Sequence, residues 1–236
     1  MAGFFQSSSN ARLSYKVAKD ALIKANINPT EAKLTQSYLR FEAILTTSNT
    51  GYQFGVLVNQ PSPGATTGGT FNTERKLNLQ DAFVCDQIGV FLGVSASTSD
   101  SSAMKLASYP DPNIITTTSA PAAAYGLYSG WLSLNVDQKN IAPYWDVQRH
   151  LVIPNTNVGG TTTAATGFNQ SELNGQTQGF APVEPTWIFN GQQNIQFSLN
   201  LPAAIGTVQA SSLGRVVVIL RGHLAQNVGI NLKQQY

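Results

Sequence analysis

Alternating hydrophobic and polar residues near the C-terminal end form the clearest pattern in the chain. Apolar residues occupy every second position from Ile195 to Leu201, and Gln, Ser and Asn lie between them. This period of two predicts a strand with one buried face. Just before it, Asn190-Gly191 predicts a tight hairpin turn, because both residues tolerate positive φ angles. The run from Arg215 to Leu220 is almost wholly apolar and predicts a strand buried on both faces.

Similar apolar segments recur along most of the chain, separated by loops rich in Gly, Pro, Ser and Thr. They predict strands within residues 38–45, 52–58, 77–92, 125–136 and 145–153. Asn49-Thr-Gly51 predicts a hairpin turn between the first two of these strands. About eight to ten strands without interleaved helices predict an all-β fold, a single jelly-roll β-sandwich. An immunoglobulin-like sandwich fits less well, because the chain is about twice as long as that fold needs and lacks paired cysteines.

The first part of the chain differs from the rest and predicts an N-terminal helical arm (residues 1–34) ahead of a β-sandwich domain (residues 35–236). Leu13, Val17 and Ala21 recur at helical spacing, and Pro29 ends the pattern. Basic residues concentrate here, and those assigned to the arm are Arg12, Lys16, Lys19 and Lys24. Two interpretations stay open: a solvated amphipathic helix, or an arm that faces a polyanion or a neighbouring subunit.

Charged residues are scarce throughout the chain. They make up 11% of its 236 residues, against about 25% in an ordinary soluble domain. Ser, Thr, Asn, Gln and Gly fill the polar positions, and such neutral groups cost less to desolvate than charged ones. The composition therefore favours a protein that packs against copies of itself. The net charge of +2 is too small to indicate a nucleic-acid specialist.

The single cysteine and the distribution of apolar residues indicate where the protein is made and how it is located. Cys85 is the one cysteine, which excludes an internal disulfide and favours synthesis in a reducing compartment. Its apolar neighbours predict that it packs as a small hydrophobic residue. No apolar run approaches the roughly 20 residues of a membrane-spanning helix. The N-terminal residues lack the pattern of a signal peptide, so we do not expect ordinary secretion.

No motif for catalysis or for cofactor binding stands out. His150 and His223 lack a metal-ligand partner at nearby positions, so structural roles are expected for both. Glycosidase chemistry needs two carboxylates, and only separation along the sequence suggests which residues could form such a pair. The possible pairs are Asp81 with Asp86, Asp137 with Asp146, and Glu172 with Glu184. Their spacing does not distinguish them from turn residues. With no nucleophile elbow, phosphate loop or dinucleotide fingerprint, we expect neither an enzyme nor a cofactor or small-molecule substrate.

Three tryptophans, Trp131, Trp145 and Trp187, lie in or near predicted strands. Burial in the core or in a subunit interface is the simpler interpretation. A lectin-like platform for sugars is the alternative. Few basic residues surround the three tryptophans, which disfavours a platform for single-stranded nucleic acid.

Two stretches carry a resemblance to a known family. They are residues 73–83 running into residues 88–92, and residues 185–187 running into residues 194–197. Together with the helical arm and the charge-poor β region, these stretches resemble the jelly-roll capsid proteins of icosahedral, tailless bacteriophages. The resemblance implies self-assembly into a closed shell, with the loops outward and the arm inside or clasping neighbours.

Further expectations follow from this resemblance. The partners would be copies of the chain and other virion proteins, and the arm would make weak contact with the genome or an internal membrane. The location would be the virion, after synthesis in the host cytoplasm. Two alternatives remain: a spike, fibre or lectin-like module that binds surface glycans, and, less favoured, an enzyme on a β-sandwich.

Overall fold

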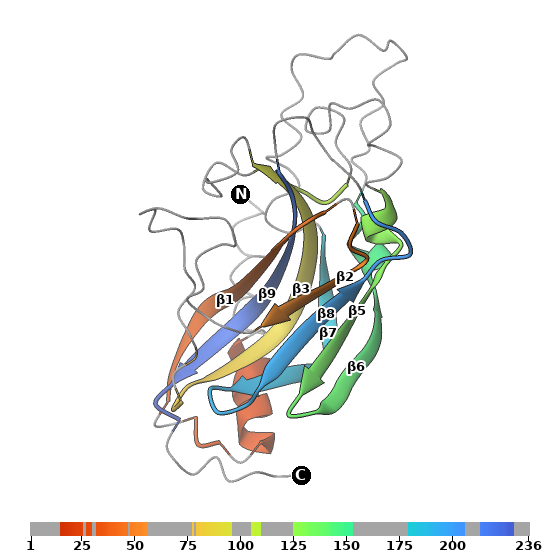
Figure 1. Cartoon of the computed structure of the whole chain (residues 1–236). Helices are drawn as coiled ribbons and strands as arrows, with labels where there is room; N and C mark the ends of the chain where they lie inside the picture. Colours follow the sequence, from red (N-terminus) through yellow and green to blue (C-terminus); the bar gives the residue numbers. More distant parts are fainter. Residues whose placement is uncertain are drawn as a thin grey trace, which may run out of the picture.

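Two antiparallel β-sheets make up most of the computed structural model, which confirms the prediction of an all-β sandwich (Figure 1). Nine strands lie in the described part of the chain. The described residues are 15–25, 27–29, 32–46, 48–55, 77, 79–95, 105–109, 125–152, 179–205 and 213–228.

The first sheet, sheet A, is built around its long central strand β9 (Leu213–Gln226). It has the order β1-β9-β3-β4, and β7 pairs with the same edge of β3 as β4 does. The bounds of the other strands are β1 Lys33–Ile44, β3 Ala82–Ser95, β4 Lys105–Ala107 and β7 Phe180–Asn190. Val216, Val217 and Val218 of β9 are fully buried, which confirms the strand predicted from Arg215 to Leu220.

The second sheet, sheet B, consists of four shorter strands in the order β2-β8-β5-β6. Their bounds are β2 Gly51–Gly55, β8 Ile195–Asn200, β5 Trp131–Val136 and β6 Lys139–Asp146. A 3₁₀ turn, η1 (Val147–His150), follows β6, and residues 125–128 form a single helical turn ahead of β5. Alternation of apolar and polar residues gives β2, β5 and β8 one buried and one outward face, whereas no residue of edge strand β6 is fully buried.

The hydrophobic core lies between the two sheets. In β8 the side chains of Ile195, Phe197 and Leu199 are buried, as their alternation predicts. The Phe197 ring lies 5.5 Å from the Phe41 ring of β1, which belongs to the opposite sheet. Cys85 of β3 is also buried in this core, as expected of a small hydrophobic residue. The inner faces of the sheets therefore pack directly on one another (Figure 1).

Both predicted hairpins are wrong. Asn49-Thr-Gly51 lies between β1 and β2, and Asn190-Gly191 lies between β7 and β8, but in each case the two strands belong to different sheets. Gly191 does not take a positive φ angle. Instead, its N–H donates to the carbonyl oxygen of Asp81, which fixes the chain as it crosses from sheet A to sheet B. A local turn sequence predicts a reversal but not the sheet that the next strand joins.

A tight two-residue hairpin joins β5 to β6, which are neighbours in sheet B. Its turn residues, Asp137 and Gln138, have φ angles of 47° and 68°. Positive φ at both central positions is the geometry that matches the twist of paired strands. The Asp137 side chain also accepts a hydrogen bond from the N–H of Asn194, which ties this turn to the start of β8.

An α-helix over residues 15–24 covers one end of the outer face of sheet A (Figure 1). Ala18 and Leu22 are buried against Ala82 and Val84 of β3 and Ala225 of β9. The buried stripe differs from the one predicted, because Val17 is exposed. The reason is geometric: the helix presents positions 18, 22 and 25 to the sheet, and small alanines allow a close approach.

Candidate functional site

The outer face of three strands of sheet B, β2, β8 and β5, is a continuous surface of uncharged side chains. Alternation along the strands directs Gln53 of β2, Ser198 of β8 and Ser133 of β5 outward, and the strand register places these three in one row across the sheet. A row on one side contains Gly51, Asn200 and Trp131, and a row on the other contains Gly55, Gln196 and Asn135. Charged residues are absent from β2, β8 and β5.

Hydrogen-bonding groups dominate this face. The Gln196 side-chain amide donates to the Gln53 side-chain oxygen at 3.1 Å, which links β8 to β2 across the surface. Amide and hydroxyl groups of this kind can exchange partners with another neutral surface without exposing or burying a net charge. The face is therefore suited to contact with another uncharged surface.

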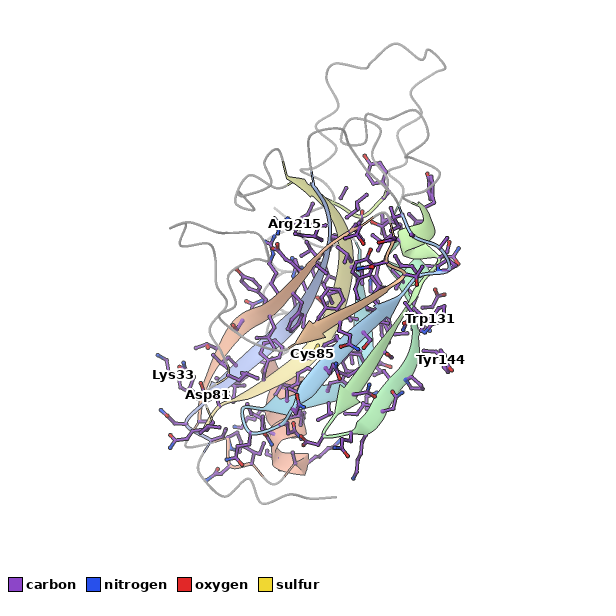
Figure 2. The ribbon with its side chains drawn as sticks, in the orientation of Figure 1. Lys33, Asp81, Cys85, Trp131, Tyr144 and Arg215 are labelled. Carbon is purple, nitrogen blue, oxygen red and sulfur yellow. The ribbon has the colours of Figure 1, made fainter. Side chains whose placement is uncertain are left out.

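Two exposed aromatic residues lie at the β5–β6 side of this face. Trp131 is 37% exposed and Tyr144 is 81% exposed. Figure 2 shows both at the side of the sandwich formed by β5 and β6, away from Cys85 in the core. Large exposed aromatic side chains are common anchors of binding surfaces.

Edge strand β6 is shaped against pairing with a further strand. Its register with β5 shifts twice, between Leu132 and Leu134 and again between Leu134 and Asn135. Pro143 lies within the strand and has no N–H to donate. Bulges and proline both disfavour addition of a strand at an edge. Contact at this side of the molecule is therefore expected through the face of the sheet.

Sheet A has a different outer surface, with charged groups near the end of β1. Glu42 pairs with Arg40 at 2.6 Å and with Arg215 of β9 at 3.5 Å. Arg215 is almost completely buried in spite of its charge. Further along β9, the Arg221 guanidinium lies 3.7 Å from the centre of the Phe180 ring. This surface is held by specific ion-pair and cation–π contacts.

The basic residues predicted for the N-terminal arm are only partly described. Arg12 lies outside the described residues. Lys16, Lys19 and Lys24 are exposed on the helix over residues 15–24, on the sides that do not pack on sheet A. The described lysines therefore share one helix and face solvent.

His150 has a structural role between the two sheets. Its Nε2 accepts a hydrogen bond from the Trp145 indole at 2.9 Å, and its Nδ1 lies 2.9 Å from the Gly179 carbonyl oxygen. Nδ1 therefore carries the proton and donates to Gly179. Burial lowers the pKa of His150, and nearby Arg149 acts in the same direction. The neutral ring fits this position, because a second proton would oppose the indole N–H.

His223 lies on the outer face of sheet A, beside the helix. It is 6% exposed, and the Tyr15 ring meets its ring edge-on at 6.1 Å. Its Nδ1 is buried without a hydrogen-bond partner among the described residues. Burial lowers the pKa of His223, and the charge of Asp86 opposes this effect.

The paired carboxylates considered from the sequence serve local structure where they are described. Asp81 accepts a hydrogen bond from the N–H of Asn227, and Asp146 accepts one from Gln148 at the start of η1. Asp137 anchors its turn as described above, and Glu184 is exposed. Glu172 lies outside the described residues.

The three tryptophans separate into two kinds. Trp187 is buried in the core, and Trp145 packs against it with the two ring centres 5.6 Å apart. Trp131 alone among them belongs to the exposed class. The sequence pattern did not distinguish the exposed Trp131 from the other two tryptophans.

The sequence analysis also did not single out Tyr144 or the neutral rows on the outer face of sheet B. The polar residues at alternate positions of β2, β5 and β8 were the sequence signal that could have indicated those rows.

Three further findings concern metal binding, membrane-spanning helices and similarity to known proteins. Among the described residues, no group of three or more His, Cys, Asp or Glu side chains lies close enough to hold a metal ion. No helix in the same part of the chain has the length and apolar character needed to cross a membrane. No protein-family model matches this sequence, and no curated protein matches it.

Proposed function

We propose that this chain is a structural virion protein, the major capsid subunit, which assembles with copies of itself into the viral shell. The observation that carries the proposal is the uncharged outer face of β2, β8 and β5 in sheet B. Burying such a face against another copy avoids the large desolvation penalty of charged groups. Repetition of one contact by symmetry then builds a closed assembly.

The order of the strands supports a jelly roll as the form of the sandwich. With the three-residue β4 set aside, the eight longer strands pair from the outside of the sequence inward: β1 with β9, β2 with β8, β3 with β7, and β5 with β6. Successive pairs alternate between sheet A and sheet B. Eight-stranded double-sheet jelly rolls are typical of viral capsid and lectin domains.

In this proposal residues 1–34 act as a helical arm and residues 35–236 as the assembling domain. The exposure of Lys16, Lys19 and Lys24 supports an outward basic surface, while Ala18 and Leu22 anchor the helix to sheet A. These lysines, with Arg12, face the genome, an internal membrane or a neighbouring subunit. The protein is made in the host cytoplasm and resides in the virion, with other virion proteins as partners and without a cofactor or a reaction.

A second candidate function has one specific observation in its favour. Trp131 and Tyr144 are exposed beside the Asn, Gln and Ser side chains of sheet B. Planar aromatic rings next to neutral hydrogen-bonding groups suit binding of an uncharged sugar, as expected of a phage spike or a lectin-like module. In that case the same face would bind glycans while the protein remained a small discrete oligomer or a monomer.

The size of the purified full-length protein separates the two functions. Sedimentation velocity at physiological salt, followed by electron microscopy, is expected to show shells, sheets or large discrete oligomers. A stable monomer across the accessible concentration range would contradict the shell proposal. Retention of that monomer on an array of neutral glycans would establish the second candidate instead.

A further inference from the structure

We infer that protonation of His223 releases the helix over residues 15–24 from the outer face of sheet A. The helix and the strands beneath it form a switch that is docked at neutral pH and opens as the pH falls. The contacts involved lie within one chain, so this inference does not depend on the proposed assembly.

The side chain of His223 lies at the boundary between the helix and sheet A. The residue is 6% exposed, and the Tyr15 ring of the helix meets its ring edge-on at 6.1 Å. Val84, opposite His223 in the register, and Ala225, two residues along β9, both pack against the helix. Departure of the helix would therefore open this part of the sheet, including His223, to water.

The buried nitrogen of His223 makes docking sensitive to protonation. Its Nδ1 has no hydrogen-bond partner among the described residues. In the neutral ring this nitrogen can be the unprotonated one, with the proton on Nε2. A second proton would place a charged N–H group at Nδ1 without an acceptor, which costs more than an unpaired neutral acceptor. The released form, in which water can accept from Nδ1, therefore binds the proton better than the docked form.

The backbone under His223 leaves the ring little freedom to find another partner. Neighbouring Gly222 packs so closely on the carbonyl group of Val84 that a Cβ atom at this glycine would overlap it. β9 is also paired on both sides at this point, with Gln36 of β1 and Val84 of β3 opposite His223. The strand is therefore held in place, and the helix is the part that can move.

The carboxylate that acts on His223 comes from a bulge in β3. Asp86 lies where the register of β3 with both β7 and β9 shifts, between Cys85 and Gln87. Bulges of this kind redirect a side chain. Burial of the ring lowers the pKa of His223, and the charge of Asp86 opposes this effect only in part. When the helix leaves, the burial is reduced while Asp86 remains, so the pKa of His223 rises.

The other charged groups around His223 do not offset its burial. Arg221, two residues away on β9, also lies in the field of Asp86, which weakens the attraction of Asp86 for a protonated ring. Gln36, opposite His223 on β1, is neutral, and the Tyr15 phenol is uncharged near pH 6.5. The helix, the near end of β1 and β7 contribute exposed charges that water screens, namely Lys16, Lys19, Asp20, Lys24, Lys33 and Glu184.

Release of the helix uncovers two apolar surfaces that are buried against each other in the docked form. One is the stripe of Ala18 and Leu22 on the helix, and the other is the patch of Ala82, Val84 and Ala225 on sheet A. Each pKa unit between the docked and released forms raises the ratio of released to docked helix by up to about tenfold on acidification. Acid thus frees the helix and makes its apolar stripe available for a new contact.

Spin labelling of the full-length protein tests the release directly. Lys19→Cys provides an exposed thiol on the helix for a nitroxide label. Cys85 gives little background, because it is buried in the core and burial raises the pKa of its thiol. The matched control is a label at Gln53→Cys, an exposed position on β2 of sheet B. Leu22→Ala serves as a second background, since it weakens docking and brings the released fraction into the measurable range.

The expected result is a mobile component in the electron paramagnetic resonance spectrum of the Lys19→Cys label that grows as the pH falls from about 7.5 to about 5.5. The spectrum of the Gln53→Cys label should stay unchanged over the same range. His223→Phe and His223→Gln both remove the titrating group, and in either variant the mobile component should no longer depend on pH. Two substitutions are used so that the result does not rest on the folding of one.

Three outcomes would overturn the inference. The first is a label at Lys19→Cys that stays immobile in acid even in the Leu22→Ala background. The second is a dependence on pH that persists in the His223 variants. The third is simultaneous mobilisation of the Gln53→Cys label, which would show that the whole sandwich unfolds. The proposed function is decided separately by sedimentation, because none of these outcomes requires self-assembly.

Discussion

The two sheets of the sandwich have similar inner faces and very different outer faces. The inner faces both carry alternating apolar residues that meet in one core. Outside, sheet A is covered at one end by a helix and carries ion pairs, whereas the four strands of sheet B are neutral apart from Lys139 and Asp146. The charged residues on the strands of sheet A are Lys33, Arg40, Glu42, Asp86, Lys105, Glu184, Arg215 and Arg221.

This difference shows that the few charged residues of the strands are unevenly distributed between the two sheets. A uniform scarcity of charge would leave every surface equally suited to association. Here the charges of the strands are concentrated on one sheet, and the other sheet keeps a neutral surface with aromatic residues at its side. Among the described residues, a helix covers part of sheet A and no element covers the outer face of sheet B. We therefore expect substitutions under the helix to affect folding and substitutions on the outer face of sheet B to affect assembly.

The largest effect on folding is expected where the helix covers sheet A. Leu22 is completely buried against this sheet, so Leu22→Ala should lower the free energy of unfolding by about 3 kcal/mol through lost burial and a residual cavity. Urea denaturation of the full-length protein measures this loss. Ile23→Ala is the matched control, because Ile23 is half exposed and its truncation should change stability by no more than about 0.5 kcal/mol. Equal effects of the two substitutions would contradict the packing of the helix on the sheet.

A smaller effect, dependent on pH, is expected from the two buried histidines. Burial lowers the pKa of His223 and of His150 below the ordinary value of 6.5. Above pH 6.5 neither the folded nor the unfolded chain binds these protons. Below it the unfolded chain binds more of them, so the free energy of unfolding falls as the pH decreases.

Comparison with His223→Phe isolates the contribution of His223. The substitution keeps an aromatic ring beside Tyr15 and removes the titrating group. Urea denaturation on both sides of pH 6.5 should show a weaker loss of stability on acidification in this variant than in the unmodified protein. An identical loss in both would show that His223 does not contribute to the dependence on pH.

The sequence predicted the elements of the fold better than their partners. The alternation around Phe197 specified the buried face of β8, because it depends on local period alone. The turn at Asn190-Gly191 did not specify that β7 and β8 join different sheets, since that choice depends on core packing across the whole chain. In the helix, Val17 and Ala18 differ little in sequence terms, and the shape of sheet A decides which of them is buried.

Surface residues were the hardest to assign from the sequence. Trp131 and Trp187 both lie in strands, yet one is exposed and the other buried, because the strand register and the neighbouring strands determine their surroundings. The positions of Gln53, Ser198 and Ser133 in one row depend on pairing between strands that are far apart in the sequence. Local patterns contain no information about such a row.

The most direct test of the account places the same new charge on each sheet. Gln53→Lys and Gln36→Lys both replace an exposed glutamine on an edge strand, in sheet B and in sheet A respectively, and neither should change folding stability by more than about 0.5 kcal/mol. Sedimentation velocity should show that Gln53→Lys abolishes large assemblies, because the new charge would have to lose its hydration in the contact, whereas Gln36→Lys assembles like the unmodified protein. Normal assembly of Gln53→Lys, or equal loss in both variants, would contradict the assignment of the outer face of sheet B as the association surface.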